Sequence, residues 1–258
     1  MPHHTLQYPK NAANTVRRIG ERGNYELEKI HGIVNSSLLL HVSFNPPDSP
    51  FPVTLPMIGQ MGAFSRPSAD IGDPMDLYIH GYVSSRIMNL TRNGVEEGMP
   101  VCVAASHVDG IVLALSAFSH SYNYRSAVLF GYATLVEDDA EKDYAMELIT
   151  NSVVPDRWSH TRLPPRKSEM QSTSILKVKI TSGSAKIRAE GAHDDKHDME
   201  NKETVSSIWT GVLPIHQTIG EAIPSSYNAV ELPTHISQFT SDFNAEGKAY
   251  STDVAKKP

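Results

Sequence analysis

The stretch DLYIHGYVSSRIMNL, from Asp76 to Leu90, holds side chains that could bind an anion. Its alternating apolar residues predict a strand that includes His80, followed by a helix that Ser84 or Ser85 caps. Hydroxyls, free amides and the guanidinium of Arg86 would then meet at one helix N-terminus, an arrangement that binds phosphate. A capped surface helix with a solvated arginine is the alternative interpretation of the same residues.

Histidine and cysteine side chains supply the other candidates for chemistry. His80 could donate a proton near neutral pH, or it could only pack and hydrogen-bond a ligand or a backbone carbonyl. The single cysteine, Cys102, lies in the apolar run VCVAA and is interpreted as a buried strand residue rather than a nucleophile. His193 and His197 stand four residues apart among aspartates, which suits a metal site on a helix or, alternatively, a solvated charged turn. His31 is expected at the surface or boundary of a helix.

Length and composition describe an ordinary globular protein. The chain has 258 residues, of which 40% are hydrophobic and 20% charged, and its formal net charge is −6. An acidic chain without a basic stripe is not expected to bind nucleic acid. No apolar run reaches the length of a transmembrane helix. A lone cysteine and an N-terminus without an apolar leader favour a cytoplasmic location.

Short strands separated by few helices dominate the predicted secondary structure. Helices are expected from about Asn24 and from Asp138 or Asp139. An aspartate–glycine pair at 109–110 and a serine–glycine pair at 182–183 predict hairpin turns. The expected strands cover residues 38–44, 53–58, 76–83, 101–105, 111–115, 126–136, 175–180, 185–188 and 205–215.

Many short strands with few helices describe an antiparallel barrel with helical decorations. Residues 59–74, rich in Gly, Pro and Ser, are expected to form a loop. Gly131, inside a predicted strand, indicates a bulge or the close approach of a neighbouring backbone. The chain is expected to fray from about Asn244. An N-terminal arm, a barrel domain and a C-terminal extension are expected at residues 1–23, 24–215 and 216–258.

A series of short motifs resembles the flavin-binding split-barrel family related to pyridoxamine 5′-phosphate oxidase. The likeness is to its branch of flavin-nucleotide-binding and nitroimidazole-resistance proteins. The sequence YIHG precedes the serine pair and Arg86, and the runs YRSxxxxG, LVEDDAEK and VPDRW follow in order. The resemblance extends from about Tyr25 to Pro214, with motifs at Tyr124–Gly131, Leu135–Lys142, Val154–Trp158, Lys186–Arg188 with Gly191, and Trp209–Gly211.

This resemblance implies a mostly β fold with α decorations, a six-stranded antiparallel split β-barrel of the FMN-binding type. It also implies a homodimer that holds two flavin mononucleotides (FMN) in clefts between its subunits. The phosphate would lie on Ser84, Ser85 and Arg86, and the isoalloxazine ring would lie beside Thr54–Met57. Trp209 would wall this pocket or fill the end of the barrel. The implied flavin-site residues are Thr54, Leu55, Pro56, Met57, Ile79, His80, Ser84, Ser85, Arg86, Arg125, Ser126 and Trp209.

The sequence departs from the oxidase in two respects. Ile87 follows Arg86 where the oxidase carries a second basic residue, so weaker phosphate binding is expected. The Arg-Leu-His-Asp-Arg type of C-terminal ending, which grips pyridoxal phosphate in the oxidase, is absent, so a vitamin B6 oxidase is not expected. His120 and Tyr122 either rim the flavin cleft or are exposed in a loop.

The resemblance favours an FMN-dependent oxidoreductase that acts on a small organic molecule. In this interpretation His80 is the catalytic residue and NAD(P)H is a candidate reductant. The alternative is a non-catalytic flavin- or haem-binding protein on the same barrel, used for storage, sensing or scavenging, because a fold does not decide an activity. No metal, nucleic-acid or membrane partner is expected.

Overall fold

The computed structural model of the chain describes residues 5–94 and 97–256. The first four residues of the predicted arm and the last two of the predicted extension lie outside the described residues. The chain divides into two compact units. Unit 1 comprises Met1–Ser106 and Ser126–Lys186, and unit 2 comprises His107–Arg125 and Ile187–Pro258.

Strands and helices are equally numerous among the elements of the described residues. In chain order the elements are η1 Gly20–Arg22, β1 Gly23–Asn24, α1 Leu27–Asn35, β2 Leu40–Phe44, β3 Val53–Met57, β4 Gly59–Gly62, β5 Asp76–Tyr82, α2 Arg86–Arg92, β6 Met99–Leu113, β7 Ser121–Leu135, α3 Asp139–Val153, η2 Trp158–His160, α4 Lys167–Ser172, β8 Thr173–Arg188, α5 Lys196–Glu200, α6 Lys202–Ser207, β9 Gly211–Pro214 and α7 Thr234–Ala255.

The strands of the described residues form one sheet of nine, not the six expected. Its order is β3-β2-β6-β7-β8-β5-β4, with β1 paired to β8 and β9 paired to β6. The neighbouring strands β2 and β3, β4 and β5, and β5 and β8 all pair antiparallel. The hydrogen-bonded path is open at β3 and β4, so the fold is a mostly antiparallel sheet with helices, and a closed six-stranded barrel is not shown.

Two predicted hairpin turns are wrong, because β6 and β8 run unbroken through them. The glycines of these turn-like pairs instead make room for neighbouring chain. A Cβ on Gly110 would lie 2.9 Å from Cγ1 of Val212, and one on Gly183 would lie 2.7 Å from Cδ2 of Leu129. Asp109 is buried rather than exposed in a turn. The two glycine-containing pairs therefore lie where the sheet packs closely. In the sequence, a glycine needed for close packing looks the same as a glycine that signals a turn.

The core of unit 1 includes a histidine that the sequence placed at the surface or boundary of its helix. His31 on α1 is fully buried, where Tyr8 Oη lies 2.7 Å from its Nε2 and the Ile71 carbonyl lies 2.9 Å from its Nδ1. Tyr8 belongs to the predicted arm and is itself buried. The sequence pattern could not show this, because both partners of the imidazole come from outside its helix.

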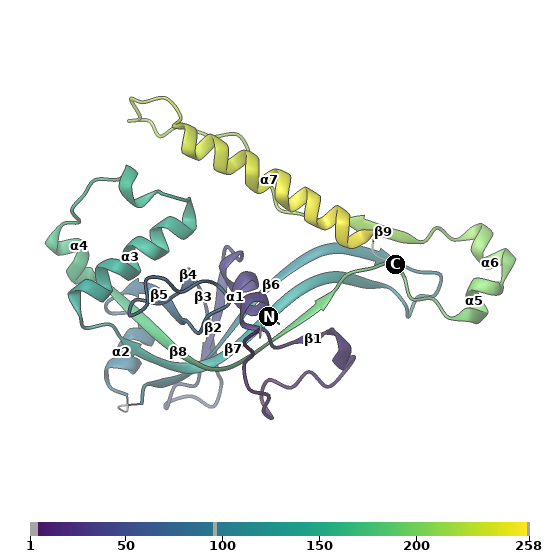
Figure 1. Cartoon of the computed structure of the whole chain (residues 1–258), viewed down its shortest axis with the longest axis horizontal. Helices are drawn as coiled ribbons and strands as arrows, with labels where there is room; N and C mark the ends of the chain where they lie inside the picture. Colours follow the sequence, from purple (N-terminus) through teal and green to yellow (C-terminus); the bar gives the residue numbers. More distant parts are fainter. Residues whose placement is uncertain (1–4, 95–96, 257–258) are drawn as a thin grey trace. The chain divides into compact units, whose positions relative to one another are not determined.

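The helix α3 covers β4 and β5, as Figure 1 shows. Asp138 caps it as predicted, accepting a hydrogen bond from the amide of Ala140. Beneath α3, Tyr78 is fully buried in a cluster with Ala145, Ile149 and Ile175. Its hydroxyl donates to Glu141 Oε1 at 2.6 Å, and Lys177 Nζ lies 2.8 Å from the same oxygen. Because Tyr78 and Leu77 are both buried, both faces of β5 are covered.

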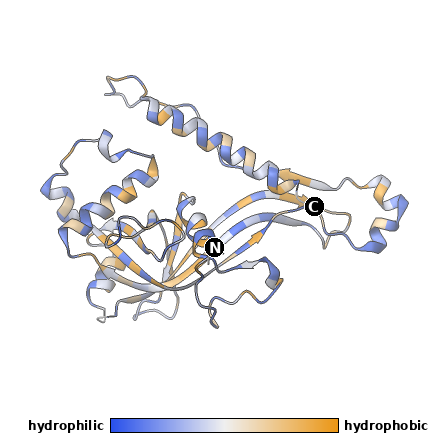
Figure 2. Cartoon of the chain, in the orientation of Figure 1, coloured by the Kyte–Doolittle hydropathy of each residue, from blue (hydrophilic) through white to orange (hydrophobic). Residues whose placement is uncertain are grey.

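Three further expectations are wrong. The predicted loop at 59–74 contains β4, and the predicted strand at 205–215 is divided between α6 and β9. The tail expected to fray belongs to α7, a helix of 22 residues whose buried residues are Ser251 and Val254. Apolar residues recur along this helix among polar ones (Figure 2). This spacing is typical of a helix, but the segment was expected to fray. No helix within residues 5–94 and 97–256 combines the length and apolar character needed to cross a bilayer.

Of the two alternatives predicted at Gly131, a bulge or a close backbone approach, the structure shows the close approach, which gives a test of the sheet. A Cβ there would lie 2.3 Å from the Lys179 carbonyl oxygen and 3.0 Å from Val178 Cγ1. We expect Gly131→Ala to lower the free energy of unfolding by about 1–3 kcal/mol, because backbone on β8 cannot move aside cheaply. Gly191→Ala is the control, since nothing lies within 4 Å of its added Cβ. Equal urea midpoints for the two variants would contradict the tight β7–β8 contact.

Candidate functional site

The turn between β5 and α2 holds a polar atom without a partner. Ser85 occupies the N-cap position of α2, as predicted, but its hydroxyl makes no capping hydrogen bond. Its Oγ is buried and finds no hydrogen-bond partner among residues 5–94 and 97–256, although its amide donates to the Tyr82 carbonyl at 2.9 Å. A buried hydroxyl left unpaired costs about 1–3 kcal/mol, so this atom is suited to contact a bound ligand or water.

Gly81 is the point where β3 approaches this turn. A Cβ on Gly81 would lie 2.9 Å from Met88 Cε, 3.5 Å from Met57 Cε and 3.9 Å from Ser85 Oγ. Met57 is the last residue of β3, so the structure brings two of the segments predicted at the flavin to one glycine. Gly81 was not predicted to belong to the site. Its position in the sequence, directly after His80 and just before a predicted helix, is the signal that could have identified it.

His80 has one polar contact and one unpaired nitrogen. The imidazole is half-buried and hydrogen-bonds the backbone of Ile58, while its Nδ1 is buried and has no partner in the part of the chain that the structure describes. Burial lowers the pKa of His80 below its usual value, and the bond to Ile58 offsets part of that effect. The ring is therefore neutral at pH 7, which suits an acceptor or a base better than the cationic donor considered from the sequence.

Arg86 is paired with an acid that the sequence gave no reason to consider. Its Nη2 lies 2.6 Å from Oδ1 of Asp48, and both side chains are largely exposed. Asp48 lies 38 residues earlier, in the loop between β2 and β3. Exposed ion pairs of this kind contribute about 0–1 kcal/mol, so an anionic ligand can compete with Asp48 for the guanidinium. Arg92, on the same helix, donates to Asn89 Oδ1 at 2.9 Å.

The other predicted site residues of unit 1 differ in exposure. Thr54 and Pro56 are exposed on β3, and Thr54 Oγ1 lies 2.9 Å from Ser43 Oγ. Ile79 is fully buried opposite Leu176 of β8, so its side chain belongs to the core. Half-buried or exposed positions are also occupied by Leu55, Met57 and Ser84.

Arg125 of unit 2 is held inside its own unit. Its Nε and Nη2 donate to the two carboxylate oxygens of Asp109 at 3.0 and 2.9 Å, and its guanidinium lies 3.9 Å from the centre of the Tyr250 ring. Asp109 is buried and holds Arg125 through two hydrogen bonds, so a phosphate could bind this guanidinium only by displacing the Asp109 carboxylate. Trp209 is exposed, and its ring lies over Gly211, where an added Cβ would meet it at 2.8 Å.

Ser126 of unit 1 is also engaged, since its hydroxyl donates to the Lys186 carbonyl at 3.1 Å. Cys102 is half-buried on β6, and burial raises the pKa of its thiol, which makes a thiolate nucleophile unfavourable. His193 lies 3.1 Å from Glu190 Oε1. Within the described ranges, no group of three or more His, Cys, Asp or Glu side chains could hold a metal ion.

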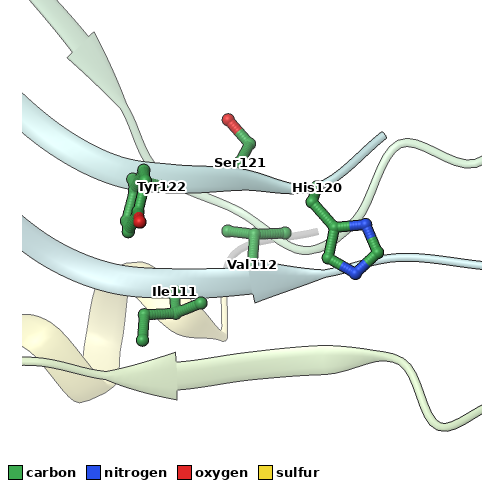
Figure 3. A pocket seen from close by; sticks show the side chains of 5 residues that line it. All are labelled: Ile111, Val112, His120, Ser121 and Tyr122. Carbon is green, nitrogen blue, oxygen red and sulfur yellow. The ribbon is translucent and has the colours of Figure 1, made fainter. Parts of the chain in front are cut away.

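His120 and Tyr122 line a pocket of about 400 Å³ within unit 2. Figure 3 shows Ile111 and Val112 reaching it from β6, and Ser121 and Tyr122 from β7, with His120 at the start of that strand. The His120 Nδ1 lies 3.0 Å from the Ser116 carbonyl oxygen. The sequence left open whether these two residues rim the flavin cleft or are exposed in a loop. Both are exposed, His120 just before β7 and Tyr122 on it, and a place at the rim of a flavin cleft stays a prediction.

Comparison with known proteins identifies one family model. Residues 26–187 match the family described as "Pyridoxamine 5'-phosphate oxidase". No curated protein matches the chain.

Solved structures with a similar fold extend over more of the chain. The flavocytochrome Anf3 from Azotobacter vinelandii is 25% identical, with a TM-score of 0.71, and the match covers 89% of this chain and 97% of that one. The FAD and heme binding protein from Mycobacterium smegmatis is 26% identical, with a TM-score of 0.69 and coverage of 85% and 97%. A putative 5-nitroimidazole antibiotic resistance protein from Bacteroides thetaiotaomicron is 18% identical, with a TM-score of 0.49 and coverage of 64% and 86%.

Proposed function

The chain belongs to the pyridoxamine 5′-phosphate oxidase family, and we propose that it is a flavin-dependent oxidoreductase acting on a small organic molecule. The observation that carries this proposal is the pair of buried, unpaired polar atoms on the two sides of Gly81, Ser85 Oγ and His80 Nδ1. Native proteins rarely leave such atoms unsatisfied, so two within six residues mark a place where a ligand completes the hydrogen bonding.

The flavin phosphate would be held by Arg86 and the serine hydroxyl beside it. Arg86 would exchange the exposed carboxylate of Asp48 for a phosphate, which offers a doubly charged and better matched acceptor. The exposed edge of β3 at Thr54–Met57 supports placing the isoalloxazine ring beside it. Both FMN and FAD carry the required phosphate; the sequence favours FMN, and one of the similar structures is named for FAD.

The chemistry comes from the flavin, which supplies hydride or electron transfer when bound. The residues of the chain bind it, orient it and move protons near it. His80 would act in its neutral form, with Nδ1 accepting a hydrogen bond or a proton from the bound molecule. The flavin is proposed to lie between two copies of the chain, with Arg125 excluded from its contacts because Asp109 already holds that guanidinium.

A second candidate function is haem binding. Two similar structures are described as a flavocytochrome and as an FAD and heme binding protein, and both match over most of this chain. An imidazole nitrogen is a common haem ligand. Among the described residues, His80 in unit 1 and His216 in unit 2 each have a buried Nδ1 without a hydrogen-bond partner, so each is a candidate ligand.

The first prediction separates phosphate binding from ring binding. Arg86→Ala should weaken FMN and FAD about 10- to 150-fold, because a charge-assisted hydrogen bond is worth about 1.5–3 kcal/mol, and should leave riboflavin nearly unchanged. Flavin-fluorescence titration with the three ligands measures this and shows whether FMN or FAD binds more tightly. Arg92→Ala is the matched control on the same helix. Asp48→Asn should bind FMN as well as the parent chain does, or up to about fivefold more tightly.

An equal loss of riboflavin and FMN in Arg86→Ala would show that the arginine acts on structure and that the phosphate lies elsewhere.

The second prediction concerns His80. His80→Ala should keep its flavin but reoxidise reduced flavin with a quinone acceptor about 10²-fold more slowly, as expected for a lost acid–base group. Because burial lowers the pKa of His80, the active neutral form persists below pH 6.5, and the parent rate should fall only as the pH drops through that lowered pKa. The variant should lack this acid limb. Stopped-flow rates from pH 5 to 8 that coincide for His80→Ala and the His120→Ala control would contradict the role.

The third prediction tests haem. Purified apoprotein titrated with hemin should develop a Soret band at one equivalent per chain. Loss of that band in His80→Ala or in His216→Ala would identify the ligand, and added imidazole should restore it in the variant that lost it. A parent chain that shows only the spectrum of free hemin would remove this second function without affecting the flavin titration.

A further inference from the structure

Two adjoining pockets of unit 1 lie between α3 and the connection that follows it, residues 154–166 (Figure 1). The larger pocket has a volume of about 450 Å³ and the smaller one about 260 Å³. Trp158, Leu163 and Pro165 line both, so the two pockets share one apolar wall. None of the residues proposed to hold the flavin lines either pocket. The flavin proposed above would therefore leave both pockets open to another ligand.

Hydrogen bonds to α3 hold both ends of this connection in place. The Trp158 amide donates to Asn151 Oδ1, near the end of α3, at 2.8 Å. From the first half of α3, Lys142 Nζ donates to the Met170 carbonyl oxygen of α4 at 2.6 Å. Two adjacent prolines restrict the backbone between these points. The shape of the pockets is therefore fixed by the fold before any ligand arrives.

The larger pocket carries negative charge. Asp143 and Glu147 line it from α3, where their spacing of four residues places both carboxylates on one face of the helix. Neither carboxylate has an ion-pair or hydrogen-bond partner among residues 5–94 and 97–256. The described residues that line this pocket include no lysine or arginine. Like charges at this spacing repel each other, and a cation bound between them would relieve that repulsion.

Aromatic rings complete the lining of the larger pocket. The Tyr144 hydroxyl accepts a hydrogen bond from the Ala63 amide at 3.0 Å, so its polar end is engaged and its ring remains for a ligand. Trp158, in the shared wall, is half-buried, and an indole face attracts cations more strongly than other aromatic rings do. In the smaller pocket Arg162 Nη2 lies 2.6 Å from both carboxylate oxygens of Glu169, so its charge is compensated locally.

We propose that these pockets bind a small organic cation, a protonated amine with an apolar body. The ammonium group lies between the carboxylates of Asp143 and Glu147, and the apolar body packs on the wall of Trp158, Leu163 and Pro165. Charge complementarity selects this ligand, because an anion would be repelled and a neutral molecule would leave both acids unpaired. A pocket of about 450 Å³ lies within the usual range for small-molecule sites.

The two tryptophans of the chain, Trp158 and Trp209, allow a direct test by NMR. The isotope-labelled, flavin-loaded chain gives one indole N–H signal for each, and Trp158→Phe assigns them. Phenethylamine should shift the Trp158 signal and leave the Trp209 signal unchanged. Phenethyl alcohol has the same ring without the charge, and ethylamine has the charge without the ring. Each should bind at least about tenfold more weakly than phenethylamine, because each lacks one of the two contacts.

Removal of the two carboxylates separates the charge from the apolar wall. Asp143→Asn with Glu147→Gln should weaken phenethylamine about tenfold and leave phenethyl alcohol unchanged. Because both acids are exposed, the variant is expected to fold, and its unchanged binding of the alcohol verifies that the pocket is intact. The matched control, Glu203→Gln with Glu246→Gln, makes the same change in net charge at exposed positions of unit 2 and should bind phenethylamine as the parent chain does.

Four results would overturn the proposal. The first is a Trp158 signal that does not move with about 10 mM phenethylamine, which is beyond the millimolar affinity of a weak site. The second is equal affinity for phenethylamine and phenethyl alcohol, which would reveal an apolar pocket without charge selection. The third is ethylamine that binds as tightly as phenethylamine, which would reveal an acidic surface only. The fourth is an equal loss of affinity in the control variant. None of these results changes the flavin titration, so the two proposals fail independently.

Discussion

Unbroken hydrogen bonding along β6, β7 and β8 is the constraint on which the other elements depend. These strands are 15, 15 and 16 residues long and lie next to one another in the sheet. Every peptide group buried in such a ladder needs a partner, so the long strands fix the register of the strands beside them. Glycines stand where neighbouring chain comes closest, at Gly110, Gly131 and Gly183. The sheet is therefore sensitive to added volume at a few backbone positions as well as to loss of its apolar side chains.

The candidate site lies at the end of β5, the strand next to β8 in the sheet. Both faces of the strand are covered in its first half, where Tyr78 packs beneath α3 and Leu77 joins the core. The strand then reaches Gly81, where the absence of a side chain lets Met57 and Ser85 approach. The site is thus formed where dense packing ends. That is also where His80 and Ser85 keep polar atoms that no described residue of the chain satisfies.

Two buried or half-buried arginines elsewhere in the described residues have their partners within the fold, unlike the polar atoms at the site. Arg188 is buried, and its guanidinium donates to the side-chain oxygen of Asn123 and to the carbonyl oxygen of Gly191. Arg125 is matched by Asp109 in the same unit. Arginines that are enclosed and fully bonded stabilise a fold, whereas an exposed one such as Arg86 can exchange its partner. This contrast favours Arg86 over Arg125 as the residue that meets a charged ligand.

The sequence by itself determined the family, the mostly β character with α decorations, and the local elements whose signals lie within a few residues. Examples are the cap at Asp138, the strand from Asp76, and the close approach at Gly131. Only the tertiary structure decided the strand count, the burial of His31 and the pairing of Arg86 with Asp48. The physical reason is the separation along the chain of the residues that interact. Periodicity and capping act over one or two turns, but a buried imidazole finds Tyr8 and Ile71, and a guanidinium finds its acid, only after distant segments have been brought together. A glycine next to an aspartate has the same local signature in a turn and in a crowded strand, so the sequence could not tell these two apart.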